Sequence, residues 1–193
     1  KLNSDALSSD KIKEFILDVY HKCDHIEEDL INDIVFFKDH DPACKYFSTQ
    51  ILFYKGFQGL ATYRAAHCLW NNDRHTMALF FQNRTSEVFG VDIHPAAEIK
   101  GGVMIDHATG VVIGETSKID ENVSIYQGVT LGGKGFEIGD RHPKIKSGVS
   151  IFASSTVLGN ITIGKNAKVA AGSLVLKDVE AETTVAGIPA KKL

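Results

Sequence analysis

The chain has 193 residues, of which 44% are hydrophobic and 23% are charged, and its formal net charge is -3. This composition is that of a globular protein that can bury a core, and the length suits one large or two small domains. The sequence has no basic surplus for binding nucleic acid and no apolar run of about 20 residues for crossing a membrane. We therefore expect a cytoplasmic protein that binds neither nucleic acid nor membrane.

Three cysteines, Cys23, Cys44 and Cys68, lie in the first third of the chain. An odd number of cysteines is a poor basis for a disulfide framework and suits a reducing compartment. Cys44 follows Asp41-Pro42, a predicted helix start, which is a setting for a reactive thiol. A buried, unpaired thiol is nevertheless the expectation for all three.

Apolar residues recur with helical spacing from Ser9 to about Phe89. Asp41-Pro42 predicts the start of one helix, with proline at its first position. Another helix is expected from about Gly56 to Trp70. Asn72-Asp73 predicts the N-terminal cap of a last helix that runs toward Val88. This half has enough apolar surface for a small helical bundle.

After Gly90 the apolar period changes to six residues, which fits neither a helix nor an alternating strand. Thirteen aliphatic residues keep this spacing: Ile93, Ile99, Ile105, Ile113, Ile119, Ile125, Leu131, Ile145, Ile151, Val157, Ile163, Val169 and Val175. A second small or aliphatic position lies four residues after many of them, at Val103, Thr109, Val123, Val129, Val149, Ser155, Ile161, Ala167, Ser173 and Val179. Hexapeptide repeats predict a parallel β-helix, in which three repeats make one triangular coil around stacked aliphatic side chains.

The sequence thus predicts an α+β protein with two domains. An α-helical domain is expected over residues 1–90 and a β-helix over residues 91–193. Two interruptions break the six-residue rhythm: two extra residues between Ile105 and Ile113, and the segment 132–144. The second is expected as an extended loop, because an insertion in a stacked repeat must leave the stack, and such loops often bind ligands. We place the functional site at these two interruptions.

The β-helix half has three histidines, each beside a hexad position: His94, His107 and His142. Residues in the same phase of neighbouring coils lie about 5 Å apart, so Asp92 is predicted to pair with His107. A carboxylate fixes the tautomer of such an imidazole, which can then act as a general base toward a hydroxyl group. Arg141 offers a fork for a carboxylate and Asp106 can accept an ammonium group. Together these residues suit a small zwitterion that bears a hydroxyl.

Two other functions stay open from the residues alone. Three histidines on a β-helix suit zinc with an open fourth position, as in a metal-dependent hydratase, and an inert repeat protein would only hold partners together. The proline, aspartate and arginine neighbours of the histidines favour hydrogen-bonded substrate groups, so we expect no metal. The chain has no acyl-enzyme elbow and no P-loop, although the backbone at Gly133 and the side chain of Lys134 can meet a phosphate.

Three segments then carry a resemblance to a known family: Asp106-His107-Ala108-Thr109-Gly110, Thr130-Leu131-Gly132-Gly133 and Gly139-Asp140-Arg141-His142-Pro143-Lys144-Ile145. With these segments in this order and spacing, the chain resembles the serine acetyltransferases among the hexapeptide-repeat acyltransferases. The match runs from Asp41-Pro42 to Ile188-Pro189-Ala190. The resemblance implies a left-handed β-helix. It also implies direct transfer of an acetyl group from acetyl-CoA to the hydroxyl of L-serine, giving O-acetylserine and CoA in cysteine biosynthesis.

The resemblance also implies roles for single residues. The catalytic pair is His107, the general base, and its partner Asp92. The serine-binding groups are the acids Asp41 and Asp106 and the carboxylate-holding Arg141 and His142. The acetyl-CoA positions are Gly133, Ala153 and Ala171, beside Lys134. Where the family usually has Gly-Ala-Gly, this chain has Phe152-Ala153-Ser154, so we expect Phe152 to reshape the CoA groove.

Partners follow from the same resemblance. It implies a homo-oligomer, either a trimer or a hexamer of two trimers joined by the helical domain, with Asp41 near its own or a neighbouring site. L-cysteine resembles serine, so we expect it to inhibit by competing at Asp106, Arg141 and His142. Members with a C-terminal tail ending in isoleucine bind O-acetylserine sulfhydrylase, and the sequence to Leu193 gives that complex no support.

Overall fold

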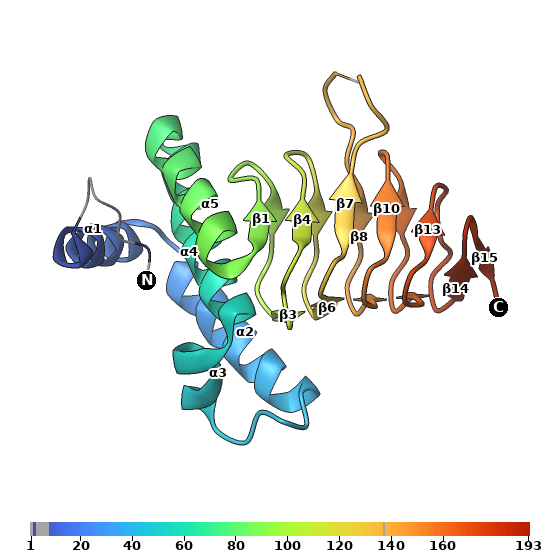
Figure 1. The fold of residues 1–193 in the computed structure, drawn as a ribbon, viewed down its shortest axis with the longest axis horizontal. Helices are drawn as coiled ribbons and strands as arrows, with labels where there is room; N and C mark the ends of the chain where they lie inside the picture. Colours follow the sequence, from blue (N-terminus) through green and yellow to red (C-terminus); the bar gives the residue numbers. More distant parts are fainter. Residues whose placement is uncertain (1, 3–7, 137) are drawn as a thin grey trace.

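A computed structural model describes residue 2, residues 8–136 and residues 138–193. Within them, helices come first and short strands follow, with the two termini at opposite ends of the molecule (Figure 1). The helices are α1 (Ser9–Lys22), α2 (Ile26–His40), α3 (Phe47–Phe53), α4 (Lys55–Asn71) and α5 (His75–Phe89). The helix expected from about Gly56 to Trp70 is confirmed as α4.

The predicted helix start at Asp41-Pro42 is wrong. Both residues lie between α2 and α3, where Oδ1 of Asp41 accepts a hydrogen bond from the backbone N–H of Ala43 at 2.8 Å. An aspartate that bonds the backbone two residues on forms an Asx turn, which competes with a helix N-cap. The next helix therefore begins only at Phe47. This turn holds Asp41 beside the β-helix.

The predicted cap at Asn72-Asp73 is also wrong. The side-chain nitrogen of Asn72 donates to the backbone oxygen of Cys68 at 2.9 Å, so this residue closes α4 instead of opening α5. Asp73 has a left-handed backbone with φ of 58°. The next helix, α5, begins at His75 and ends at Phe89.

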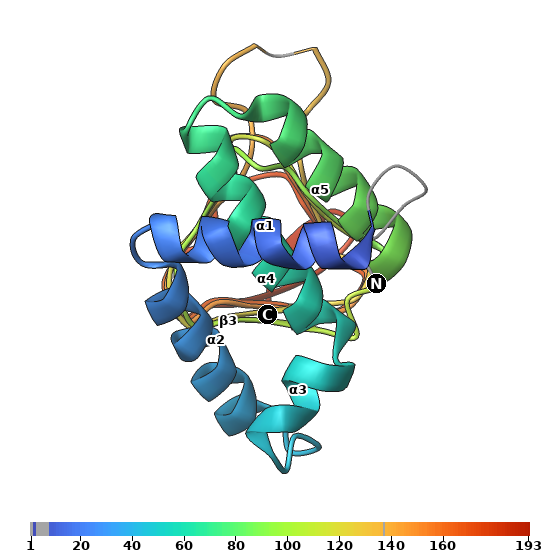
Figure 2. The ribbon, with the colours of Figure 1, turned by 90° about the vertical axis from the view of Figure 1, so that its left-hand side faces the viewer.

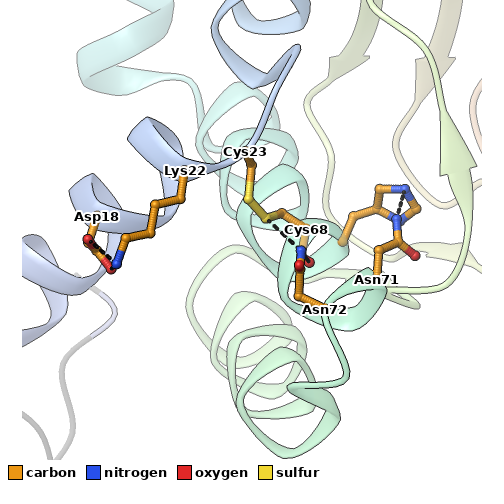
Figure 3. The surroundings of a disulfide bond; sticks show 7 residues. Asp18, Lys22, Cys23, Cys68, Asn71 and Asn72 are labelled. Carbon is orange, nitrogen blue, oxygen red and sulfur yellow. Dashed lines mark hydrogen bonds and ion pairs between the residues drawn. A yellow bond between two sulfur atoms is a disulfide. The ribbon is translucent and has the colours of Figure 1, made fainter.

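The expectation of three unpaired cysteines is corrected by a disulfide between Cys23 and Cys68, whose Cα atoms are 6.3 Å apart (Figure 3). The bond joins the turn after α1 to the last part of α4. An odd number of cysteines leaves room for one pair, and only the fold brings two positions 45 residues apart together. Cys44 is free and buried, as expected.

In the part of the chain that the structure describes, fifteen short strands form three parallel faces, closed at the C-terminal end by one antiparallel pair. The first face contains β1 (Val91–Ile93), β4 (Val111–Ile113), β7 (Thr130–Gly132), β10 (Thr156–Leu158) and β13 (Leu174–Val175). The second face contains β2 (Glu98–Ile99), β5 (Lys118–Ile119), β8 (Lys144–Ile145) and β11 (Thr162–Ile163). The third face contains β3 (Val103–Asp106), β6 (Val123–Tyr126), β9 (Ser150–Ile151), β12 (Lys168–Val169), β14 (Thr184–Gly187) and β15 (Ala190–Lys192).

Successive coils superpose as a triangle when viewed along the axis (Figure 2). The chain climbs the first face and returns behind it while advancing toward the C-terminus, which is a left-handed path (Figure 1). The expected fold, a helical half followed by a left-handed parallel β-helix, is confirmed. On either side of residue 137, the described residues between β7 and β8 project from the coils (Figure 1).

The hexad aliphatics form the core of the β-helix. All thirteen are buried, and paired positions such as Ile105 and Ile125 stack in register on neighbouring coils. Thr109 was also predicted to face inward, four residues after Ile105, and this prediction is wrong because Thr109 is exposed. The two extra residues move Val111 into the inward place, where it is fully buried. The insertion therefore changes which side chains face outward at this corner.

Helix α4 covers the open N-terminal end of the β-helix, since its Leu60 and Tyr63 join the same core cluster as the hexad residues. Beside them, the buried guanidinium of Arg64 donates to both carboxylate oxygens of Asp33 at 2.8 and 2.9 Å. It also donates to the backbone oxygens of Ile99 and Lys100 at 3.1 and 3.0 Å. This network joins α2 and α4 to the first coil.

Candidate active site

A cavity of about 500 Å³ lies where the helical half meets the corner between the third and first faces. Its lining residues are Phe37, Asp41, Ala43, Phe53, Tyr54, Lys55, Gly56, Ile105, Asp106, His107 and Thr109. The cavity brings together three predicted site residues, Asp41, Asp106 and His107. It holds an imidazole, two carboxylates and one ammonium group.

His107 lies on the two-residue insertion and presents an exposed ring, with 73% of its side chain accessible. His107 and Ala108 both have left-handed backbones, with φ of 56° and 63°. Such conformations are strained for residues other than glycine and cluster at functional sites. Asp106 supports the turn, because its Oδ1 accepts the N–H of His107 at 2.8 Å while its Oδ2 lies 3.6 Å from the imidazole Nε2.

The first turn of α4 packs directly on this corner. The Lys55 ammonium contacts the hydroxyl of Thr109. Gly56 lies so close to the strand end that a Cβ there would collide with the backbone carbonyl of Ile105 and approach the Cβ of Ala108. Helix α4 thus positions the loop that carries His107.

Substituting Gly56→Ala should lower the free energy of unfolding by about 1–3 kcal/mol, because the added methyl must push α4 away from the backbone of β3. Gly59→Ala is the matched control on the same helix, since its Cβ would meet Val91 and Thr85 only at ordinary contact distances of 3.4–3.5 Å. That control should be neutral or stabilising by up to about 1 kcal/mol, because alanine favours the helix. Urea denaturation measures both changes, and equal effects would contradict the close packing.

Arg141 and His142 lie at a different corner, between the first and second faces. Arg141 Nη2 pairs with Glu115 Oε2 at 2.6 Å, and its backbone N–H donates to Thr116 Oγ1 at 3.0 Å. His142 is buried, and its ring fills the space over Gly114. Neither Arg141 nor His142 lines the cavity that contains His107.

The surroundings of His142 favour a neutral ring that can donate one hydrogen bond. Its Nδ1 accepts the backbone N–H of Thr116 at 3.1 Å, which leaves the proton of the neutral ring on Nε2. Burial lowers the pKa of His142, and the charge of Arg141 lowers it further. Arg141 in turn holds the pKa of the Glu115 carboxyl below its usual range through their hydrogen bond. This corner therefore offers a cation and a neutral N–H donor.

Asp92 lies on β1, where its Oδ1 accepts a hydrogen bond from Gln82 of α5 at 2.7 Å. Among the interactions of the described residues, none joins Asp92 to His107. The carboxylate that lies near the His107 ring is that of Asp106, with its Oδ2 3.6 Å from Nε2. The Asp92–His107 pair therefore stays a prediction.

The expected acetyl-CoA positions lie at two corners of the β-helix. Gly133 and Lys134 begin the projecting segment, and the Lys134 ammonium donates to the backbone oxygen of Leu176 at 3.1 Å. Ala153 and Ala171 lie at the corner between the third and first faces, on neighbouring coils linked by the hydrogen bond from the N–H of Gly172 to the oxygen of Ala153 at 2.8 Å. That is the corner that also carries His107.

Among the described residues, no group of three histidine, cysteine or acidic side chains is arranged to hold a metal ion. His94 lies near the Arg141 corner, where burial lowers its pKa and the carboxylates of Glu115 and Asp92 oppose that shift. None of the helices in the described ranges has the length and apolar character that a membrane crossing needs.

Known proteins are similar to this chain in both sequence and fold. A family model described as serine acetyltransferase, N-terminal, matches residues 1–62. Serine acetyltransferase from Haemophilus influenzae is 48% identical over 191 residues, which cover 99% of this chain and 72% of that protein. The chain belongs to the serine acetyltransferase family. Serine acetyltransferase 2 of Arabidopsis thaliana is 58% identical over 166 residues, 86% of this chain, and the match spans 51% of that longer relative.

Solved structures of serine acetyltransferases superpose on the whole chain. One from Neisseria gonorrhoeae, in complex with serine, has a TM-score of 0.96 and 47% identity, and 78% of it is covered. Another serine acetyltransferase, in complex with CoA, has a TM-score of 0.95 and 46% identity, and 80% of it is covered. A complex with cysteine has a TM-score of 0.97 and 47% identity, also with 80% covered.

The sequence did not reveal several residues that shape these two corners of the serine acetyltransferase fold. Tyr54 and Lys55 line the His107 cavity, and Glu115 and Thr116 orient Arg141 and His142. The Gly114-Glu115-Thr116 segment directly follows hexad residue Ile113, so a search for outward polar residues beside the hexads would have found it. Tyr54 and Lys55 gave no such signal, because they reach the corner that carries His107 only in the folded chain.

Proposed function

We propose that the chain is a serine O-acetyltransferase that moves an acetyl group from acetyl-CoA, its co-substrate, to the hydroxyl of L-serine. The observation that carries this proposal is the cavity in which the exposed His107 imidazole lies beside the carboxylates of Asp41 and Asp106. A base next to acidic groups suits an acceptor with a hydroxyl and an ammonium group. The relatives solved with serine and with CoA support the same substrates.

In this proposal, His107 accepts the proton of the serine hydroxyl as the oxygen attacks the thioester carbonyl, and Asp92 stabilises the imidazolium. A C–O bond forms, the C–S bond breaks, and the proton passes from the imidazolium to the departing thiolate, giving O-acetylserine and CoA. Asp41 and Asp106 bind the ammonium group. Acetyl-CoA lies along the corner that carries Ala153 and Ala171.

The two halves of the serine site favour an oligomer. His107 lies at one edge of the first face, and Arg141 and His142 lie at the opposite edge. The face is about four residues wide, which is about 13 Å. One serine molecule cannot reach from one edge to the other. We therefore propose a trimer or a hexamer of two trimers, in which Arg141 and His142 of a neighbouring subunit complete the serine site. Gly133 and Lys134 of that same subunit would then lie beside the acetyl-CoA.

L-cysteine is the inhibitor that this site should accept. It carries the same ammonium and carboxylate groups as L-serine and differs by a thiol in place of the hydroxyl. The relative solved in complex with cysteine supports this proposal. The groups that would hold it are Asp106, Arg141 and His142.

The assay for the proposed function is release of CoA thiol from acetyl-CoA by the purified chain. Release should depend on L-serine, be absent without an acceptor, and be unchanged by a chelator, because a histidine base needs no metal. Chelator-sensitive release would favour the metal-dependent alternative. No release with any hydroxyl acceptor would leave only a scaffolding role.

A further inference from the structure

Two tyrosines without an assigned role lie beside the carboxylates of the cavity. Tyr54 lines the cavity together with Asp41 and Asp106. Tyr126 is the last residue of β6, and its Cα is paired with that of Asp106 in the parallel register of β3 and β6. Outward side chains at paired positions lie side by side, about 5 Å apart. Each acid of the cavity therefore has a phenol in its neighbourhood.

Both tyrosine rings are held by packing. Tyr54 and Tyr126 contact the same buried cluster, formed by Phe36, Phe37, Cys44 and Met104. Tyr126 also stacks on Phe152 of the next coil, with ring centroids 5.2 Å apart and an interplanar angle of 16°. Phe152 stands where the family usually has a small residue. An aromatic pair of this kind contributes about 0.5–1.5 kcal/mol beyond its buried area.

The phenols are suited to donate hydrogen bonds to these acids. Burial raises the pKa of Tyr126, and the charges of Asp106 and Asp41 raise it further. Burial also raises the pKa of Tyr54. The charge of Asp41 and a hydrogen bond with its carboxylate raise that pKa further. Both hydroxyls therefore remain protonated at neutral pH. In the described part of the chain, the ammonium group of Lys55, which also lines the cavity, donates its hydrogen bond to the hydroxyl of Thr109 and not to these acids.

The acid pair needs such donors. One oxygen of each carboxylate already accepts a backbone N–H at 2.8 Å, from Ala43 for Asp41 and from His107 for Asp106. The second oxygen of each carboxylate still has lone pairs that can accept hydrogen bonds. An ammonium group has only three N–H donors, so it cannot satisfy all of these acceptors. A phenol donates a hydrogen bond and fixes the direction of a carboxylate without adding a charge.

We propose that Tyr54 and Tyr126 are positioning residues for the ammonium end of the acceptor: Tyr54 orients Asp41, Tyr126 orients Asp106, and Phe152 holds the ring of Tyr126. This inference rests on the proposed function. It extends the acceptor site to two residues outside the predicted set. It also gives Phe152 a role that differs from the expected reshaping of the CoA groove.

The test uses the purified variants Tyr54→Phe and Tyr126→Phe, which remove only the hydroxyl. Loss of a hydrogen bond to a charged group costs at least about 1.4 kcal/mol, so the KM for L-serine should rise about tenfold in each variant. The kcat and the KM for acetyl-CoA should stay within about twofold. Phe152→Leu should reproduce part of the Tyr126→Phe effect, because it keeps apolar bulk and removes the stack.

Two fragments of serine separate positioning from a general loss of structure. Ethanolamine keeps the ammonium group and 3-hydroxypropionate keeps the carboxylate, and each is measured as a competitor of L-serine. The inhibition constant of ethanolamine should rise in both tyrosine variants, and that of 3-hydroxypropionate should not change. Tyr46→Phe is the matched control, since Tyr46 is exposed and lies outside the cavity.

The outcomes distinguish this inference from the proposed function. A wild-type chain without serine-dependent thiol release would contradict the proposed function itself. An active wild type with unchanged KM values in both tyrosine variants would overturn the inference alone. Equal changes for ethanolamine and 3-hydroxypropionate would also overturn it, because they would show a role that is not specific to the ammonium group.

Discussion

Replacing His107 with asparagine should lower kcat by about 10³-fold, within the 10²–10⁴ range that a general base contributes. Asparagine is the sharper substitution, because it tolerates the left-handed backbone of this position better than alanine does. The fold should be retained, since the side chain is mostly exposed. Thiol release from acetyl-CoA with saturating L-serine measures the loss, and circular dichroism checks the fold.

His25→Asn is a matched control for this prediction. His25 also has a left-handed backbone, with φ of 69°, and an exposed ring, but it lies at the start of α2 and outside the cavity. Its activity should equal that of the wild type. A His107→Asn variant that keeps more than about a third of the wild-type kcat would show that His107 is not the base.

Mixing subunits extends the test to the divided site. Co-expressed His107→Asn and Arg141→Met chains should regain up to about a quarter of the wild-type activity, since some interfaces then contain one intact His107 and one intact Arg141. Each variant expressed alone should be nearly inactive. A mixture that is as inactive as the two variants would contradict a site shared between subunits.

The fold was predictable from sequence because the β-helix repeats a local rule. Each hexad places one aliphatic residue inward, and every one of these positions from Ile93 to Val175 is buried. The helical half was less predictable at its ends. Asp41 and Asn72 are residues that cap helices in isolation, but here they bond a turn and the preceding helix instead. A choice between alternative local hydrogen bonds is decided by the surrounding structure.

The two corners of the candidate site were predictable because they interrupt the repeat, whereas the contacts that depend on packing were not. The two extra residues after Ile105 marked the corner that carries His107, and the segment 132–144 marked Arg141 and His142. Contacts across coils depend on how the coils stack. The Asp92–His107 pair stays a prediction, and in the structure Asp92 accepts a hydrogen bond from Gln82 of α5. Tyr126 and Phe152 meet only through the register of β6 and β9.

Replacing Arg64 with methionine should lower the free energy of unfolding by about 3–5 kcal/mol. The substitution leaves the carboxylate of Asp33, which has no exposed surface, without its charged partner. It also leaves the backbone oxygens of Ile99 and Lys100 without their donor. Urea denaturation measures the change. Lys100→Met is the control, because the Lys100 ammonium pairs with Asp120 and Glu121 while 62% exposed, and an exposed pair contributes less than about 1 kcal/mol.

A second substitution separates the charge from the packing. Asp33→Asn in the Arg64→Met background removes the unpaired charge and keeps an acceptor for the backbone N–H of Val103, which donates to Asp33 at 2.9 Å. The double variant should therefore be more stable than Arg64→Met alone. If it is not, the loss comes from the guanidinium's contacts with the first coil. Either result bears on the site, because Asp41 follows α2 and His107 follows β3, and Arg64 and Asp33 hold α2 against that strand. Weakening this junction should raise the KM for L-serine as well.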